Sequence, residues 1–335
     1  MANFTILGSG GFGMSLAVML NRLGHTVTVW SAFSKELEDI KKDGEHRSKL
    51  PGVKIPDSIN LNPDISCING SDIVLLGIPS PYVRDVAKKA SPYITPEMIV
   101  VNTSKGLENG TLKLISDVIK EEVPQAPAVI LSGPSHAEEV ARGIPTTVVA
   151  ASENNDAAVY VQDIMSSNVF RIYINNDVIG CEIGGALKNI IALCAGICDG
   201  LNYGDNTKAA LITRGIAEIT RLGLAMGADF ATFSGLSGIG DLIVTCASMH
   251  SRNRRAGILI GKGYTTKEAM DEVQMVVEGV YAAKAAKKLA EKYNVEMPIV
   301  EQVNQVLFDG KSPADGVKDL MLRDKKIEAG NVEWH

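Results

Sequence analysis

A glycine-rich turn between two strands constrains the fold of this chain more than any other feature. Residues 3–7 form a short apolar run typical of a strand, the segment GSGGFG follows at 8–13, and a helical pattern runs from 14 to 23. A second strand pattern, TVTVW, covers 26–30. Glycines spaced G-x-G-x-x-G between a strand and a helix are typical of a dinucleotide-binding βαβ unit. The sequence therefore predicts a Rossmann-type sheet at the N-terminus.

Each glycine of this turn has an expected task. Gly8 permits the tight turn, Gly10 lets the backbone approach a pyrophosphate at the helix N-terminus, and Gly13 lets helix and strand pack closely. The acid that usually binds the ribose 2′-hydroxyl of NAD is expected at the end of the second strand, where this chain has Ser31 and Ala32. Because no carboxylate stands there to repel a 2′-phosphate, we expect NADPH as the cofactor, with NADH as the alternative.

The rest of the chain divides into a strand-containing part and a helical part. Further strand patterns are expected at 72–78, 98–103, 128–131, 146–150 and 169–174, with a helix at 34–43, a loop at 50–56 and a helix at 82–90. Strand signals then fade, and helices are expected at 182–200, 207–226, 229–234, 266–272, 279–293, 298–308 and 313–329, with a loop at 237–257. The predicted fold class is α/β, a doubly wound Rossmann-type sheet in residues 1–178 followed by an all-α C-terminal domain in residues 179–335. We expect the site between the two domains.

Composition excludes several classes of function. The net charge of −6 argues against broad nucleic-acid binding. The five cysteines have neither zinc-site nor disulfide spacing, so we expect no metal and a reducing, cytoplasmic compartment. The N-terminus lacks the basic region of a signal peptide, and no uninterrupted apolar stretch is long enough to predict a membrane span.

Two lysines occupy unusual places in the sequence. Lys188 lies in the almost wholly apolar segment 177–201, where a buried lysine needs a partner and has a lowered pKa. The alternative is a lysine whose stem packs while its ammonium group reaches water. Gly184 and Gly185, one turn earlier, allow another backbone or a ligand to approach. Lys105 follows the strand at 98–103, at the sheet edge where open α/β sheets bind ligands.

The densest basic segment, SRNRR at 251–255, complements these lysines. Arginine binds phosphate through two parallel hydrogen bonds, although a solvated basic surface is an equal alternative. The five histidines are scattered, so a lysine is the natural general acid. Hydride delivery to a ketone creates an alkoxide, which a neighbouring ammonium group stabilises and protonates. The arginines suggest that the ketone carries a phosphate.

Eight segments together resemble one known family. They are GSGGFG at 8–13, SKG at 104–106, SGPSHAEEVARG at 132–143, IGGALKNIIALCAGICDGL at 183–201, DNTKAALITRG at 205–215, GLSGIGDLIVTC at 235–246, SRNRRAG at 251–257 and VVEG at 276–279. Across nearly its whole length the chain is similar to the soluble bacterial NAD(P)-dependent glycerol-3-phosphate dehydrogenases. The resemblance implies reduction of dihydroxyacetone phosphate to sn-glycerol 3-phosphate for phospholipid synthesis.

The resemblance also implies roles for individual residues. Lys188 would be the catalytic proton donor, and the substrate would be held by Lys105, Gly133, Ser135, Lys188, Asn189, Asp241, Ser251, Arg252 and Asn253. The cofactor would contact Gly8, Gly10, Gly11, Phe12, Gly13, Lys105, Ala137, Arg252, Val276 and Glu278. No metal is implied, and the sequence leaves a homodimer open.

Three positions depart from the family pattern. Gly11 stands where Ser is frequent, Ser31-Ala32 where many members have Arg or His, and His136 where Phe is common. Two other functions remain open on the residues alone. A related dehydrogenase acting on a hydroxy acid would not require a phosphate ester, and a nicotinamide-sensing binding protein would bind the cofactor without turnover.

Overall fold

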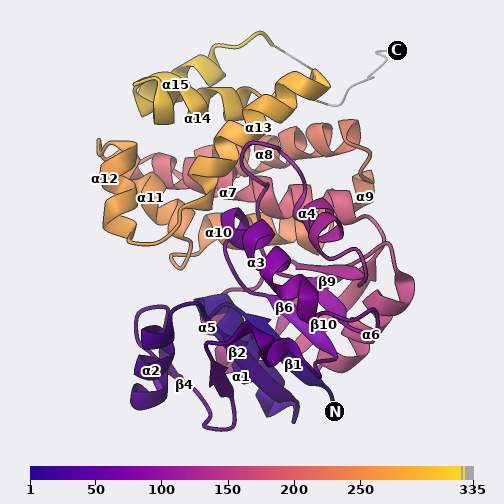
Figure 1. Cartoon of the computed structure of the whole chain (residues 1–335). Coiled ribbons are helices and arrows are strands. Elements are labelled where there is room, and N and C mark those ends of the chain that lie inside the picture. Colours follow the sequence, from indigo (N-terminus) through magenta and orange to yellow (C-terminus); the bar gives the residue numbers. More distant parts are fainter. Residues whose placement is uncertain (326, 329–335) are drawn as a thin grey trace.

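The computed structural model describes residues 1–325, 327 and 328. Two domains lie one above the other, with the sheet and its helices in the lower domain of Figure 1 and helices alone, among the described residues, in the upper one. The strands are β1 (Asn3–Leu7), β2 (Thr26–Trp30), β3 (Glu45–His46), β4 (Leu50–Lys54), β5 (Asn60–Asn62), β6 (Ile73–Leu76), β7 (Ile99–Asn102), β8 (Ala128–Ser132), β9 (Thr146–Ala151) and β10 (Phe170–Asn175).

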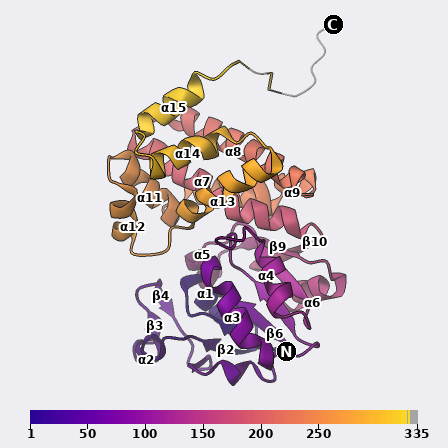
Figure 2. The same cartoon turned by 45° about the horizontal axis from the view of Figure 1, so that its top comes forward.

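The central sheet has the order β10-β9-β8-β7-β6-β1-β2-β5, while β3 and β4 form a separate hairpin. All neighbours pair in parallel except β8 and β9. Side chains alternate between the two faces, so Ile6 enters one hydrophobic core and Leu7 the other. Helices cover both faces, which confirms the doubly wound architecture predicted from the sequence (Figure 2). These helices are α1 (Gly11–Arg22), α2 (Ser34–Asp43), α3 (Val83–Ala90), α4 (Ile115–Glu122), α5 (Ala137–Arg142) and α6 (Asn155–Met165).

The second domain is built around α7 (Val178–Gly200). Around it lie α8 (Asp205–Ala225), α9 (Phe230–Phe233), α10 (Asp241–Ala247), α11 (Arg252–Gly261), α12 (Thr266–Val273), α13 (Glu278–Tyr293), α14 (Pro298–Phe308) and α15 (Pro313–Met321). Glycines bring α7 and α11 into backbone contact, because a Cβ on Gly196 or Gly257 would lie only 2.0 Å from a carbonyl oxygen of the other helix. This close packing fixes the start of α11 beside the middle of α7.

Three predictions about local structure were wrong. Residues 50–56 are not a simple loop, because Leu50–Lys54 pairs with β3. The segment 237–257 is not a loop either: a π-helical turn, Leu236–Gly240, leads into α10, and α11 follows. Its glycines and small polar residues mimic a loop, whereas burial against α7 makes it helical. The last helix ends at Met321 and not at 329, and residues 326 and 329–335 of the predicted C-terminal domain lie outside the described residues.

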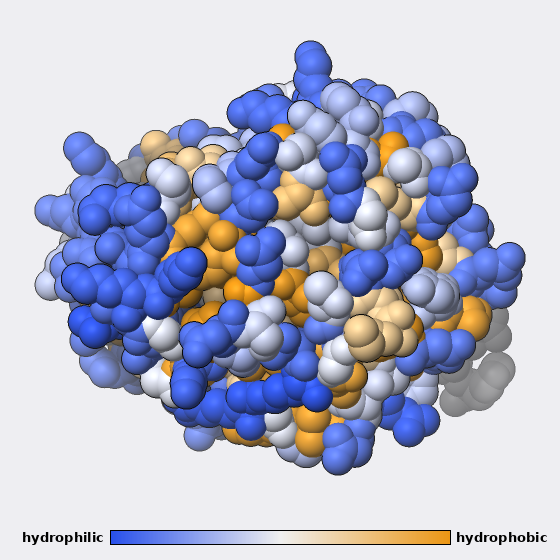
Figure 3. All heavy atoms as spheres, turned by 60° about the horizontal axis from the view of Figure 1, so that its bottom comes forward, coloured by the Kyte–Doolittle hydropathy of each residue, from blue (hydrophilic) through white to orange (hydrophobic). Residues whose placement is uncertain are grey.

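Two stretches of the described chain have the length and apolar composition of a membrane span, Val178–Gly200 and Phe230–Ala247. In the first, 94% of the apolar window is buried inside the protein, so its composition is that of a core helix. The second is interrupted at Gly238, whose backbone is not helical. The face shown in Figure 3 is mostly hydrophilic, with apolar side chains gathered in a hollow beside a hydrophilic lobe at the left.

Candidate active site

Two lysines from different domains meet on one buried carboxylate. Asp241, the first residue of α10, is 1% exposed and forms ion pairs through one oxygen with Lys188 of α7 and through the other with Lys105, 2.6 Å away. Lys188 also donates to Thr245 Oγ1 at 2.8 Å, and Lys105 donates to the Gly133 carbonyl at 2.9 Å. A buried lysine was expected to need a partner, and the structure shows that this partner is Asp241. Through Lys105 the same carboxylate joins the α7 helix to the carboxyl edge of the sheet.

Burial controls the charge of this cluster. Desolvation lowers the pKa of Lys188 to about 8, although Asp241 partly opposes the shift. For Asp241, desolvation acts to raise the pKa, but the charges of Lys105 and Lys188 outweigh it and leave the pKa below its usual range. The cluster thus combines a carboxylate whose pKa is lowered with a lysine that can exchange a proton near neutral pH.

Two glycines in the first half of α7 make this meeting of the domains possible. A Cβ on Gly184 would lie 2.5 Å from the Ser237 carbonyl oxygen, and one on Gly185 would lie 3.1 Å from Ser132 Oγ and 3.7 Å from Lys105 Cγ. Close approach at these glycines was predicted from the sequence. They place the turn before α10 and the end of β8 directly against the helix that carries Lys188.

A second network links α7, α11 and α13 next to the lysines. Asn253 donates to Asn189 Oδ1 at 2.9 Å and accepts from the Gly279 backbone N–H at 2.8 Å. Asn189 in turn donates to Glu278 Oε2 at 3.2 Å. Desolvation raises the pKa of Glu278, and the neighbouring charge of Arg252 partly opposes this. Both ends of the Asn253 carboxamide are therefore engaged within the protein.

The predicted arginine cluster separates in the structure. Arg254 donates to Asp199 at 2.7 Å and to the Ala247 carbonyl, while Arg255 is exposed. Ser251 caps α11 by accepting from the Arg254 backbone N–H at 3.2 Å. The guanidinium of Arg252 lies near Glu278, and it has no hydrogen bond to any described residue. The charge available to an anion at this point is that of Arg252.

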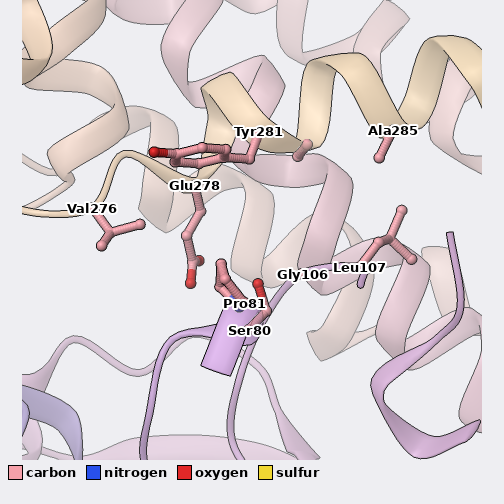
Figure 4. A pocket seen from close by; sticks show the side chains of 9 residues that line it. Ser80, Pro81, Gly106, Leu107, Val276, Glu278, Tyr281 and Ala285 are labelled. Atoms are coloured by element: carbon pink, nitrogen blue, oxygen red, sulfur yellow. The ribbon is translucent and has the colours of Figure 1, made fainter. Parts of the chain in front are cut away.

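A cleft opens between the domains beside Glu278. Figure 4 shows the Glu278 carboxylate extending from the start of α13 toward Ser80 and Pro81 of the first domain. The predicted residue Val276 lines the same cleft, on the same side as Tyr281. The cleft is lined by Ser80, Pro81, Gly106, Leu107, Val276, Glu278, Tyr281, Ala282 and Ala285.

The glycine turn directly follows β1, at the carboxyl edge of the sheet. Gly8 has φ +120, and a Cβ there would lie 2.6 Å from Ile78 Cγ2, so only glycine fits. Gly10 caps α1, whose first residues are Gly11, Phe12 and Gly13. A Cβ on Gly11 would lie 2.4 Å from the Lys49 carbonyl oxygen, which accounts for the departure from Ser.

The remaining predicted residues lie between this turn and the lysines. Ala137 is the first residue of α5, and its Cβ would lie 3.8 Å from a Cβ placed on Gly11. Ser135 donates to the Gly133 carbonyl at 3.0 Å. The predicted set therefore follows one edge of the sheet and reaches α7, α10, α11 and α13, but it does not form a single contact cluster.

Sequence reasoning missed several polar groups of this site. Thr245 follows Asp241 by one helical turn, a signal hidden by the prediction of a loop. Among the described residues, three buried side-chain atoms have no hydrogen-bond partner: Ser132 Oγ, His136 Nε2 and Ser237 Oγ. Burial lowers the pKa of His136, and the charge of Lys188 adds to the effect, so the neutral form of the ring is favoured. Unpartnered buried polar groups near the domain junction are suited to a polar ligand.

A further missed group is an acid that lies close to the end of β2. Glu36 of α2 accepts a hydrogen bond from Ser9 in the glycine turn and lies 3.4 Å from Ser31 Oγ. Glu36 lies in the first turn of α2, so a carboxylate is close to the end of β2 although none directly follows that strand in the sequence.

Comparison with known proteins agrees with this arrangement. Residues 3–158 match the family described as NAD-dependent glycerol-3-phosphate dehydrogenase N-terminus, and residues 177–318 match the corresponding C-terminus. The chain is 54% identical to glycerol-3-phosphate dehydrogenase [NAD(P)+] of Fusobacterium nucleatum, covering 98% of this chain and 99% of the relative. It is also 54% identical to the protein of that name from Agathobacter rectalis, over 100% of both chains.

Solved structures give the same result. The crystal structure of glycerol-3-phosphate dehydrogenase from Coxiella burnetii superposes with a TM-score of 0.92 at 36% identity, covering 96% of this chain and 99% of that one. The glycerol-3-phosphate dehydrogenase of Plasmodium falciparum superposes with a TM-score of 0.86 at 25% identity, covering 98% and 97%. Both domains, their order and their sequences match, and the chain therefore belongs to the NAD-dependent glycerol-3-phosphate dehydrogenase family.

Proposed function

We propose that this oxidoreductase reduces dihydroxyacetone phosphate to sn-glycerol 3-phosphate, reversibly, with a reduced nicotinamide cofactor, and that the product enters glycerophospholipid synthesis. The observation that carries the proposal is the buried Asp241 carboxylate shared by Lys188 and Lys105 at the junction of the domains. Family membership fixes the class of reaction, and this cluster supplies an acid for it.

Proton transfer is assigned to Lys188. The bound nicotinamide supplies the hydride, and the carbonyl oxygen that becomes an alkoxide needs both a positive charge and a proton. Asp241 and Thr245 hold the Lys188 Nζ in place from one side, the latter at 2.8 Å. Because the pKa of Lys188 is about 8, its ammonium form predominates at pH 7 and can donate the proton. In the reverse direction the neutral amine accepts it.

The substrate phosphate is assigned to the start of α11. Arg252 has a guanidinium without a hydrogen bond to the described residues, and it lies in the first turn of a helix whose N-terminus favours anions. Asn253 is a positioning residue in this proposal, because its carboxamide already binds Asn189 and the Gly279 backbone. Lys105, Gly133, Ser135, Asn189 and Ser251 complete the proposed substrate contacts.

The cofactor is assigned to the edge that runs from the glycine turn to Glu278. Gly8 and Gly13 leave no room for side chains, which suits a turn that holds a pyrophosphate by its backbone. Gly10, Gly11, Phe12, Lys105, Ala137, Arg252, Val276 and Glu278 are the further proposed contacts. NADPH was expected, with NADH as the alternative, because no acid directly follows β2. Glu36 lies 3.4 Å from Ser31 Oγ, so a carboxylate is nevertheless close to that point.

The test measures loss of reduced-nicotinamide absorbance with dihydroxyacetone phosphate, run in parallel with NADH and NADPH. Turnover with either cofactor supports the proposal, provided that unphosphorylated dihydroxyacetone is a much poorer substrate. Equal rates with both ketones would favour a dehydrogenase that does not recognise phosphate, and cofactor binding without turnover on any ketone would favour a binding protein. A cytoplasmic location, the absence of a membrane span and a possible homodimer remain predictions.

A further inference from the structure

The side chain of Glu36 lies between two segments that border the adenosine side of a dinucleotide site. Its Oε2 atom accepts a hydrogen bond from Ser9 Oγ, in the glycine turn after β1, and lies 3.4 Å from Ser31 Oγ, directly after β2. In dinucleotide-binding βαβ units an acid at the end of the second strand accepts a hydrogen bond from the ribose 2′-hydroxyl. Glu36 reaches the same corner from the next helix.

The other carboxylate oxygen faces the β3–β4 hairpin. Oε1 accepts from His46 Nε2 at 3.1 Å and forms an ion pair with Lys49. The Glu36 side chain is 19% exposed. Burial acts to raise the pKa of Glu36, but its hydrogen-bond donors outweigh burial and lower the pKa to about 2. The carboxylate is therefore an anion at neutral pH.

The two oxygens have separate surroundings, and this decides what the site can accept. Lys49 and His46 could serve a 2′-phosphate, but both are turned to Oε1 of Glu36. A phosphate dianion at this corner would face the negatively charged Oε2 atom, to which the Ser9 and Ser31 hydroxyls donate. A ribose hydroxyl, in contrast, can donate directly to Oε2.

We propose that Glu36 is a specificity-determining residue for the cofactor ribose, so that this chain prefers NADH to NADPH. The inference rests on the proposed function only in requiring that a nicotinamide dinucleotide binds at the glycine turn. Removing the charge of Glu36 leaves a polar side chain of equal size and frees Lys49 to approach a 2′-phosphate. The preference should then weaken or reverse.

Calorimetric titration with ADP-ribose and 2′-phospho-ADP-ribose tests this without any turnover. The wild-type protein should bind ADP-ribose at least ~10-fold more tightly, the scale of one hydrogen bond to a charged group. In Glu36→Gln the ratio should fall by ~10-fold. Glu38→Gln is the matched control, because Glu38 is an exposed carboxylate on the same helix, and its ratio should equal that of the wild type.

The role of Lys49 is tested by Lys49→Met in both backgrounds. In Glu36→Gln, adding Lys49→Met should abolish any gain in affinity for 2′-phospho-ADP-ribose. Tighter binding of 2′-phospho-ADP-ribose by the wild type, lost in Lys49→Met, would overturn the proposal, because Lys49 would then hold a phosphate despite Glu36. If a variant fails to fold, a wild-type preference for 2′-phospho-ADP-ribose still overturns the proposal.

The same titrations separate this inference from the proposed reaction. A preference for ADP-ribose without turnover of dihydroxyacetone phosphate would refute the reaction and leave the role of Glu36 intact. Turnover together with a preference for the 2′-phosphorylated ligand would refute the role of Glu36 and leave the reaction intact.

Discussion

Replacing Lys188 by methionine tests the central feature of the site. Methionine has nearly the length of the lysine stem, so the packing of α7 is retained while the ammonium group is lost. A positioned general acid typically contributes ~10²–10⁴-fold to the rate. We therefore expect kcat for dihydroxyacetone phosphate reduction to fall by ~100-fold or more, while affinity for the reduced cofactor stays within ~3-fold of the wild-type value.

The structure also sets the stability cost of this change. Losing one partner of a buried ion pair typically costs ~3–5 kcal/mol, because a charge is left unpaired. Asp241 keeps Lys105 at 2.6 Å, so we expect a cost at or below the lower end of this range. Lys208→Met is the matched control, since Lys208 pairs with Asp199 at 2.6 Å, and this variant should retain normal turnover.

The pH dependence of the wild-type enzyme provides an independent readout. Because burial lowers the pKa of Lys188 to about 8, the reduction rate should fall as the pH rises through about 8, and the oxidation rate should rise over the same interval. This limb of the profile should be absent in Lys188→Met. A folded variant, confirmed by its thermal unfolding transition, that keeps more than a tenth of the wild-type kcat would refute the assignment of Lys188 as proton donor.

Three further predictions concern binding and stability. Arg252→Ala should raise KM for dihydroxyacetone phosphate by ~10-fold or more, the value of a charged hydrogen bond, and steady-state kinetics should show no such change for exposed Arg255→Ala. Burial raises the pKa of Glu182 from 4.5 to about 7, so the stability that protonated Glu182 contributes is present below pH 4.5 and is lost as the pH rises through about 7. The free energy of unfolding in urea should therefore depend on pH, and Glu182→Gln should remove on the order of 3 kcal/mol of this dependence. Gly257→Ala should destabilise the protein by at least ~1–3 kcal/mol in the same assay, because the new Cβ would lie 2.0 Å from the Leu193 carbonyl oxygen; an unchanged unfolding midpoint would contradict the packing of α7 against α11.

Local patterns in the sequence predicted the elements that depend on local physics. The strand, glycine turn, helix and strand of residues 3–30 follow from hydrophobic periodicity and from the backbone freedom of Gly8. The burial of α7 follows from its continuous apolar composition. The same reasoning failed for α10 and α11, because glycine and small polar residues usually indicate a loop when the helix they pack against is unknown.

What the sequence determined by itself was the doubly wound sheet, the helical second domain and the presence of an unusual buried lysine. Only the tertiary structure decided that Asp241 bridges Lys188 and Lys105, residues far apart in the chain. It also divided the arginines, leaving Arg252 available while Arg254 binds Asp199, and brought Glu36 to the glycine turn. The physical reason is that secondary structure depends on neighbours along the chain, whereas burial, ion pairing and pKa depend on neighbours in space.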